Sequence, residues 1–293
     1  MKLILLAVVF CIVAPLGLVA QDKADAHKIG GAFAVDTAKG LAYREGKDAD
    51  PVRHKLDIYT PKGQKNFPVL MFVHGGTWKS GNKELYAPLG QLLAKNGIGT
   101  VIINYRLSPA VKHPAHIEDV AKAFAWTHKN IAKYGGNPNN FFVCGHSAGG
   151  HLVSLLSTNE TYLKAEKLAI SNIKGTIPIS GVFVLLPTAQ LKDVFTEDKD
   201  IVKSATPIEF VKGKHPPSLM IYADKEIATL DVQAELMCKK LLEAKCEAQT
   251  LKIDNRTHTS IIVNMANEAD PATQAVFGFL AKHGGLKLQN VKK

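Results

Sequence analysis

The sequence contains few cysteine residues, few aromatic residues and, beyond its N-terminal segment, no apolar run long enough to cross a membrane. Only 4 of its 293 residues are cysteine, and 7% are aromatic. If the segment that holds Cys11 is removed, the three cysteines that remain cannot all pair with one another. The sequence is therefore not that of a small scaffold held by disulfides, although a Cys238–Cys246 bridge stays open.

Basic residues outnumber acidic ones without forming a concentrated basic surface in the sequence. Lysine and arginine total 36 against 26 acidic residues, which gives a formal net charge of +10. The lysines are scattered over expected helix faces and the C-terminal tail, and no arginine-rich stripe alternates with aromatic residues. We therefore expect no nucleic-acid partner.

The N-terminal segment has the pattern of an export signal. Residues 3–19 are apolar, but Pro15 interrupts the run, which is short for a membrane anchor. The small residue Ala20 precedes a polar sequence, as expected at a cleavage site. We predict a signal peptide at residues 1–20, a single domain at residues 21–293, no membrane span, and a secreted or periplasmic location.

The rest of the chain alternates between strand-like and helix-like segments. The expected strands are 41–45, 55–60, 69–74, 98–105, 140–145, 173–180, 217–223 and 247–253. The expected helices are 84–95, 117–134, 148–158, 231–244 and 273–283. Several of the strands are continuous runs of β-branched residues, which is typical of parallel strands buried on both faces. The pattern predicts an α/β fold, a mostly parallel central sheet with helices on both faces, in which the weakly periodic segment 182–213 is a short lid-like insertion.

The sequence GHSAG at residues 145–149 lies directly between an expected strand and an expected helix. A sharp strand-to-helix turn with small residues on both sides lifts a serine hydroxyl clear of the sheet. The pattern predicts Ser147 as a catalytic nucleophile.

A second glycine-rich turn, HGGTW at residues 74–78, follows another expected strand. Acyl transfer places negative charge on the former carbonyl oxygen, and glycines let backbone N–H groups approach that oxygen. The expected oxyanion hole comprises Gly75, Gly76, Thr77 and Ala148. We expect Trp78, at the end of the turn, to line the substrate pocket.

The nucleophile needs a histidine base and an acid that orients it. His258 follows a strand in a short polar segment, whereas His283 ends a helix and His215 precedes the strand that should deliver the acid. We predict His258 as the base. Two carboxylates, Asp224 and Glu226, follow the acid-bearing strand, and both are candidates for the acid.

Four motifs together resemble the hormone-sensitive-lipase-like and feruloyl-esterase-like carboxylesterases of the α/β-hydrolase superfamily. They are HGGTW at 74–78, NYRLSP at 104–109, HPA at 113–115 and GHSAGG at 145–150. The resemblance covers residues 40–283. In these enzymes the acid segment is Gly-Asp-x-Asp with the second acid catalytic, so the resemblance places Glu226 in the catalytic position. Glutamate replaces the usual aspartate there, which keeps Asp224 as the alternative acid.

The resemblance implies a serine carboxylesterase that hydrolyses small or aromatic or sugar-linked carboxylic esters through an acyl-enzyme, with a small-molecule ester as its partner and no cofactor. The HGGTW turn is also similar to that of kynurenine formamidases, so an arylformamidase-type amide hydrolase is one alternative. A non-catalytic binding protein on the same fold is another. The pairs His113–His116 and His146–His151 lack a convincing third ligand, and we expect no metal site.

Overall fold

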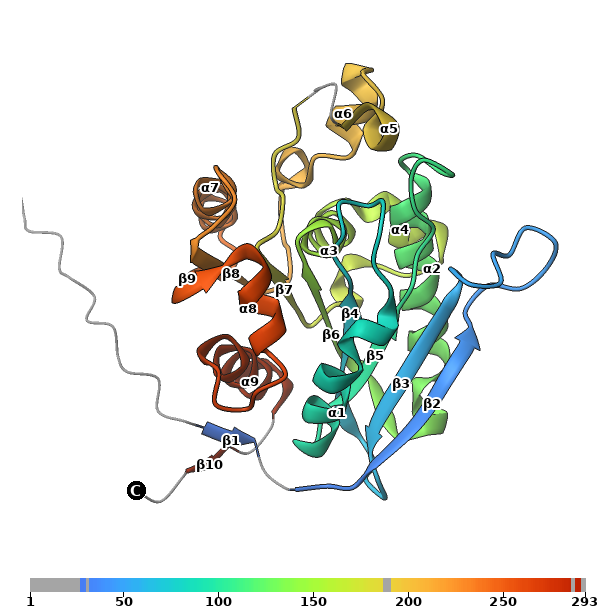
Figure 1. Ribbon diagram of the computed structural model, residues 1–293, viewed down its shortest axis with the longest axis vertical. Helices are drawn as coiled ribbons and strands as arrows, with labels where there is room; N and C mark the ends of the chain where they lie inside the picture. The colour runs from blue at the N-terminus through green and yellow to red at the C-terminus, as the bar shows by residue number, and fades with distance from the viewer. Residues whose placement is uncertain (1–26, 30–31, 187–190, 286–287, 291–293) are drawn as a thin grey trace, which may run out of the picture.

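The structure is a computed structural model that describes residues 27–29, 32–186, 191–285 and 288–290 (Figure 1). The predicted signal peptide at residues 1–20 lies outside these described ranges. Within them, no helix has both the length and the apolar character needed to span a bilayer.

Within the described residues, eight strands form one sheet in the order β2-β3-β5-β4-β6-β7-β8-β9 (Figure 1). The strands are β2 (Val35–Ala42), β3 (Lys55–Pro61), β4 (Phe67–Val73), β5 (Gly99–Ile103), β6 (Gly136–His146), β7 (Gly175–Ile179), β8 (Ser218–Lys225) and β9 (Ala248–Thr257). Strand β3 pairs antiparallel with β2 and β5, and all other neighbours pair parallel. Two short strands, β1 (His27–Ile29) and β10 (Leu288–Asn290), form a separate antiparallel pair. The expected mostly parallel sheet is confirmed.

Helices cover both faces of the sheet, as predicted. One face carries α1 (Ala87–Lys95), α8 (His258–Asn264) and α9 (Pro271–Gly284). The other carries α2 (Ala115–Asn130), α3 (Ala148–Thr158) and α4 (Glu160–Ala165). Helix α7 (Leu230–Glu243) packs in a third cluster beside β8. Side chains of β4 alternate between the two main cores, with Val69 and Met71 in one and Leu70 and Phe72 in the other.

Several predicted element boundaries need correction. The strand expected at 41–45 is β2, which begins at Val35, and β6 begins at Gly136 rather than at residue 140. The first turn of the helix expected at 84–95 is the 3-10 helix η1 (Lys83–Tyr86). Residues 255–257, expected as loop, continue β9, and α8 starts at His258 because Thr257 and Ser260 form a capping box. Helices α4 and α8 are too short to show a clear period in the sequence.

The insertion at 182–213 forms α5 (Lys192–Phe195), α6 (Lys199–Ser204) and the 3-10 helix η5 (Pro207–Phe210) in its described part. In Figure 1, α5 and α6 lie together at the top of the view. Phe195 packs with its ring centroid 4.8 Å from that of Trp78 and 5.5 Å from that of His151. The insertion is therefore anchored to the loop after β4 and to α3.

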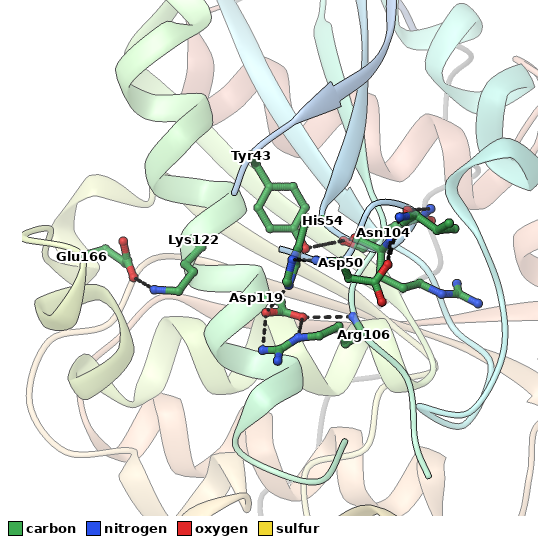
Figure 2. A network of polar contacts seen from close by, with 10 residues as sticks. Tyr43, Asp50, His54, Asn104, Arg106, Asp119, Lys122 and Glu166 are labelled. Carbon is green, nitrogen blue, oxygen red and sulfur yellow. Dashed lines mark hydrogen bonds and ion pairs between the residues drawn. The ribbon is translucent and has the colours of Figure 1, made fainter. Parts of the chain in front are cut away.

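A buried polar network ties the start of β3 to the end of β5 and to α2 (Figure 2). The Asp119 carboxylate accepts hydrogen bonds from Nε and Nη2 of Arg106, at 2.8 and 2.7 Å, and from Nε2 of His54 at 3.0 Å. The Tyr43 hydroxyl donates to the Asn104 carbonyl at 2.9 Å. Because every oxygen of the buried carboxylate has a donor, its burial carries no unpaired charge.

The cysteines of the described chain, Cys144, Cys238 and Cys246, are all buried free thiols. Burial raises the pKa of the Cys144 thiol well above its ordinary value. The Cys246 thiol donates to the Gly213 carbonyl at 3.3 Å. The Cys238–Cys246 bridge that the sequence left open is therefore not formed.

Candidate active site

Ser147 occupies a sharp bend between β6 and α3. Its backbone angles, φ 53° and ψ −117°, lie in a region that residues with a side chain rarely adopt. The Ser147 N–H donates to the Ile179 carbonyl on β7 at 2.9 Å. The hydroxyl side chain is thereby presented at the carboxyl edge of the sheet, as the GHSAG pattern predicts.

The glycines beside this bend are required by close contacts between backbones. A Cβ on Gly145 would lie 2.3 Å from the Gly149 carbonyl oxygen, and one on Gly149 would lie 2.0 Å from the Val73 carbonyl oxygen. Neither contact could be relieved by moving a flexible side chain. Helix α3 therefore begins in direct backbone contact with the end of β4.

In the loop after β4, the Gly76 carbonyl is hydrogen-bonded within the loop, whereas the N–H groups of Gly76 and Thr77 have no acceptor among the described residues. The Gly76 carbonyl accepts from the N–H groups of Lys79 and Ser80, at 3.0 and 2.9 Å. Gly76 has φ 115° and Thr77 has φ 52°, and among the described residues none accepts a hydrogen bond from either N–H. The Ala148 N–H is the first of α3, where a helix has no internal acceptor.

His74 contacts this loop and helps to hold its conformation. Its Nδ1 donates to the Gly75 carbonyl at 2.7 Å, and its ring stacks on Tyr105 with centroids 4.4 Å apart. Burial lowers the pKa of His74 to about 4, so the ring is neutral near pH 7. His74 therefore holds the position of the loop.

His258 and Glu226 form a direct contact. Nδ1 of His258, the first residue of α8, lies 2.5 Å from Oε1 of Glu226, which follows β8. The Glu226 side chain is 3% exposed and that of His258 is 16% exposed. With Nδ1 engaged by the carboxylate, Nε2 is the ring nitrogen that can exchange a proton with another group.

Several donors keep Glu226 ionised. Burial by itself raises the pKa of Glu226, but hydrogen bonds from His258, Ser180 and the Ile227 N–H outweigh it and lower the pKa to about 2. The Ser180 hydroxyl donates to Oε2 at 2.5 Å, and the Ile227 N–H donates to Oε1 at 2.8 Å. A charged carboxylate therefore faces His258 throughout the neutral range.

Asp224, the alternative acid, points elsewhere. Its two carboxylate oxygens accept from the N–H groups of Asn255 and Arg256, at 2.9 and 2.8 Å. These hydrogen bonds lower the pKa of Asp224. The geometry thus brings Glu226 to His258, while Asp224 fixes the end of β9 just before the histidine.

Ser147 and His258 line the same cavity, which has a volume of about 690 Å³. Gly75, Gly76 and Thr77 also line it. The structure thus brings the predicted nucleophile, base and oxyanion loop to one space. A hydroxyl can pass its proton to an imidazole there, beside N–H groups that can donate hydrogen bonds to an oxygen on which negative charge develops.

The expectation that Trp78 lines the substrate pocket is corrected by its position. Trp78 is 4% exposed, and its Nε1–H donates to Nδ1 of His151 at 3.3 Å. The indole packs edge-on against Phe195 and His151, and Trp78 is not among the residues that line the cavity. The described residues of 182–213 likewise contribute nothing to the lining of this cavity.

Sequence reasoning missed two residues that support the site. Ser180 lies at the end of β7, next to β8 in the sheet, so its strand-end position is the signal that could have identified it. His146, considered earlier only as half of a metal pair, donates from Nε2 to the His258 carbonyl at 2.9 Å. Burial lowers the pKa of His146 to about 4, and the neutral ring fixes the start of α8.

The two histidine pairs considered for a metal have other partners. His151 donates from Nε2 to the Ala205 carbonyl at 2.7 Å, and His116 contacts the Ser108 hydroxyl at 3.1 Å. In the part of the chain that the structure describes, no cluster of three or more His, Cys, Asp or Glu side chains could hold a metal ion.

Comparison with solved structures identifies the class of fold. A truncated carbohydrate esterase from gut microbiota matches with a TM-score of 0.74 at 21% identity, covering 87% of this chain and 98% of that structure. An esterase from Thermogutta terrifontis with propionate bound matches with a TM-score of 0.72 at 19% identity, covering 88% and 97%. With the sheet order and the Ser147 bend, these matches define an α/β-hydrolase fold.

The family can be stated more narrowly from the sequence comparison. The BD-FAE family model matches residues 56–241, which is more than half of the chain, and the protein belongs to the BD-FAE family. This region holds the HGGTW turn, the Ser147 bend and Glu226. His258 lies beyond it.

Two curated relatives from Mycobacterium tuberculosis are also similar. Esterase LipQ is 31% identical over 194 residues, covering 60% of this chain and 46% of LipQ. Esterase LipC is 32% identical over 208 residues, covering 64% of this chain and 51% of LipC. The chain thus spans about half the length of these relatives.

Proposed function

We propose that the protein is a serine carboxylesterase in which Ser147, His258 and Glu226 form a catalytic triad. The observation that carries the proposal is the 2.5 Å contact between His258 and Glu226 at the cavity that Ser147 also lines. The named esterase relatives support the same reaction. Acyl transfer is the chemistry that this combination of hydroxyl, oriented imidazole and free N–H groups suits.

The first half of the reaction transfers the acyl group to the protein. Nε2 of His258 takes the Ser147 hydroxyl proton as the oxygen attacks the ester carbonyl carbon. The N–H groups of Gly76, Thr77 and Ala148 donate hydrogen bonds to the carbonyl oxygen as it becomes negatively charged. His258 then gives its proton to the departing alcohol oxygen, which leaves Ser147 acylated.

The second half releases the acid with water as the nucleophile. His258 takes a proton from water as the water oxygen attacks the acyl carbon, and then returns the proton to the Ser147 oxygen. Glu226, ionised at neutral pH, stabilises the charged imidazole in both halves.

The test is the Ser147→Ala variant, compared with wild type and with Ser171→Ala as a matched control on the exposed 3-10 helix η3 (Ile170–Asn172). We expect kcat for p-nitrophenyl acetate to fall by several powers of ten in Ser147→Ala and to stay unchanged in the control. A phosphonate probe should label wild type and Ser171→Ala but not Ser147→Ala. Undiminished hydrolysis by Ser147→Ala would overturn the proposal.

The same assay, with N-formylkynurenine added as a substrate, separates the esterase from the two alternative functions. A formamidase would hydrolyse N-formylkynurenine with a higher kcat/KM than any carboxylic ester. A binding protein on this fold would neither turn over esters nor react with the phosphonate.

We also propose that the protein is exported, because its N-terminal segment has the composition of a signal peptide. Expression of the full chain followed by N-terminal sequencing of the released protein should give a mature form that begins at Gln21. A protein that stays in the cytoplasm with Met1 intact would contradict this.

A further inference from the structure

The cavity at Ser147 has two apolar walls that neither the reaction nor the triad requires. One wall comes from η1 and α1 and the other from α8 and the residues just after it, and α1 and α8 lie on the same face of the sheet (Figure 1). The wall residues are Leu85, Pro88, Leu89, Ile262, Val263 and Ala266. A volume of about 690 Å³ is in the range of small-molecule sites.

The rim of the cavity exposes large apolar side chains from three separate elements. Leu85 in η1 and Val263 in α8 are each 67% exposed, and Ile227, after β8, is 54% exposed. Apolar side chains gathered around a concave site are typical of a surface that a ligand covers. An apolar group placed between them would remove this area from water.

Apart from the reacting groups around Ser147 and His258, the described lining of the cavity offers no charged side chain that could neutralise a charged substrate group. Among the described residues that line it there is no aspartate, glutamate, lysine or arginine. The nearby Glu226 already accepts from His258, Ser180 and Ile227, and His146 is held neutral by burial. A carboxylate held between the apolar walls would lose hydration without gaining a lysine or arginine partner.

We propose that the substrate is an uncharged ester whose apolar group lies between α1 and α8. This inference rests on the proposed esterase function and names its substrate class. The net charge of +10 would by itself draw anionic esters toward the protein. A lower kcat/KM for anionic than for neutral esters would therefore come from the cavity and not from the net charge of the protein.

The first experiment compares esters of equal length that differ in one terminal charge. The acyl pair is p-nitrophenyl hexanoate and the p-nitrophenyl half-ester of adipic acid. The alcohol pair is hexyl acetate and 6-acetoxyhexanoate. We expect kcat/KM for the charged member to be at least about ten-fold lower in one of the two pairs, and that pair shows whether the apolar group belongs to the acid or to the alcohol.

The second experiment introduces a positive charge into the α8 wall. Val263→Lys should raise the ratio of kcat/KM for the charged ester to that for the neutral ester by about five-fold or more, because the lysine supplies the missing partner. The matched control is Val232→Lys on α7, where the valine is similarly exposed, at 64%, and does not line the cavity. A merely destabilised protein would lose both activities together and leave the ratio unchanged.

The outcomes separate this inference from the proposed function. If no ester in either pair shows Ser147-dependent hydrolysis, the proposed function fails. If hydrolysis depends on Ser147 but the charged and neutral esters have equal kcat/KM in both pairs, or if Val263→Lys leaves their ratio at the wild-type value, the substrate class is wrong while the esterase stands.

Discussion

The histidine–carboxylate pairs His54–Asp119 and His258–Glu226 share the same chemistry and differ in access. In the buried network of Figure 2, His54 contacts Asp119 at 3.0 Å, and both side chains are fully buried. Nδ1 of His54 also accepts from the Asp50 N–H at 2.7 Å, so both ring nitrogens of His54 are hydrogen-bonded. At the active site His258 contacts Glu226 through Nδ1 while its other edge lines a cavity.

The difference shows that a neighbouring carboxylate is not by itself sufficient to make a histidine a catalytic base. The pKa of His54 is lowered, because burial outweighs the attraction of Asp119. The neutral His54 ring thus serves as a structural link between the segment before β3 and α2. A base needs one ring nitrogen that is oriented by the acid and a second that can reach the reacting atoms.

The largest effect should come from removing the two histidines in turn. We expect His258→Gln to lower kcat by about 10⁴-fold, as loss of a triad member does, with little change in unfolding. We expect His54→Gln to lower the free energy of unfolding by about 1–3 kcal/mol, since Asp119 loses a donor. Urea unfolding and kcat of the folded fraction measure both. If folded His54→Gln lost as much kcat as His258→Gln, the distinction between a structural and a catalytic histidine would be wrong.

The two acids at the carboxyl end of β8, Asp224 within the strand and Glu226 after it, give the next largest effect. Glu226→Gln keeps the shape of the side chain but removes the charge that stabilises the imidazolium, so kcat should fall by about 10³-fold. Asp224→Asn should lower kcat by no more than about ten-fold, because Asp224 contacts backbone N–H groups and not the ring. Turnover of p-nitrophenyl acetate compares them, and a greater loss in Asp224→Asn would reverse the assignment.

Ser180→Ala tests how much the hydrogen bond from Ser180 to Glu226 contributes to catalysis. Losing the 2.5 Å hydrogen bond to Oε2 should lower kcat about five- to ten-fold and leave KM nearly unchanged. In a double-mutant cycle, adding Ser180→Ala to Glu226→Gln should have little further effect on kcat. Additive losses would show that Ser180 acts by another route.

The smallest effect is on acid stability. The pKa of Glu226 is about 2 in the folded protein against an ordinary value of 4.5, so the ionised form favours folding. This contribution is complete above about pH 4.5 and is lost as the pH falls toward 2. The excess unfolding free energy of wild type over Glu226→Gln should therefore shrink between pH 7 and pH 3. A constant difference would show that the charge of Glu226 does not stabilise the fold.

The sequence predicted the parts of the site that follow strand order. GHSAG, HGGTW and the two carboxylates at the end of β8 all stand at carboxyl ends of parallel strands, which meet at one edge of the sheet. The same rule could have placed Ser180 beside Glu226. Most helices and strands were also predictable, because their apolar periods are long and regular.

Contacts that depend on direction or on long separation could not be predicted. His54 and Asp119 are 65 positions apart, and no local pattern links them. Trp78 is buried against Phe195 and His151, and the positive φ of both Thr77 and Trp78, neither of them glycine, is a backbone conformation that no sequence pattern indicates. Helix α8 was missed because its first residue, His258, follows β9 directly with no intervening turn.

The close approach of Gly149 to Val73 has a consequence for redesign of the protein. The segment bearing Ser147 and the segment leading into the oxyanion loop abut through main-chain atoms, so their spacing is independent of the side chains that surround the cleft. Selectivity could therefore be altered at positions such as Leu85 or Val263 while the reacting groups keep their mutual alignment. A methyl group at position 149 would instead push those two segments apart.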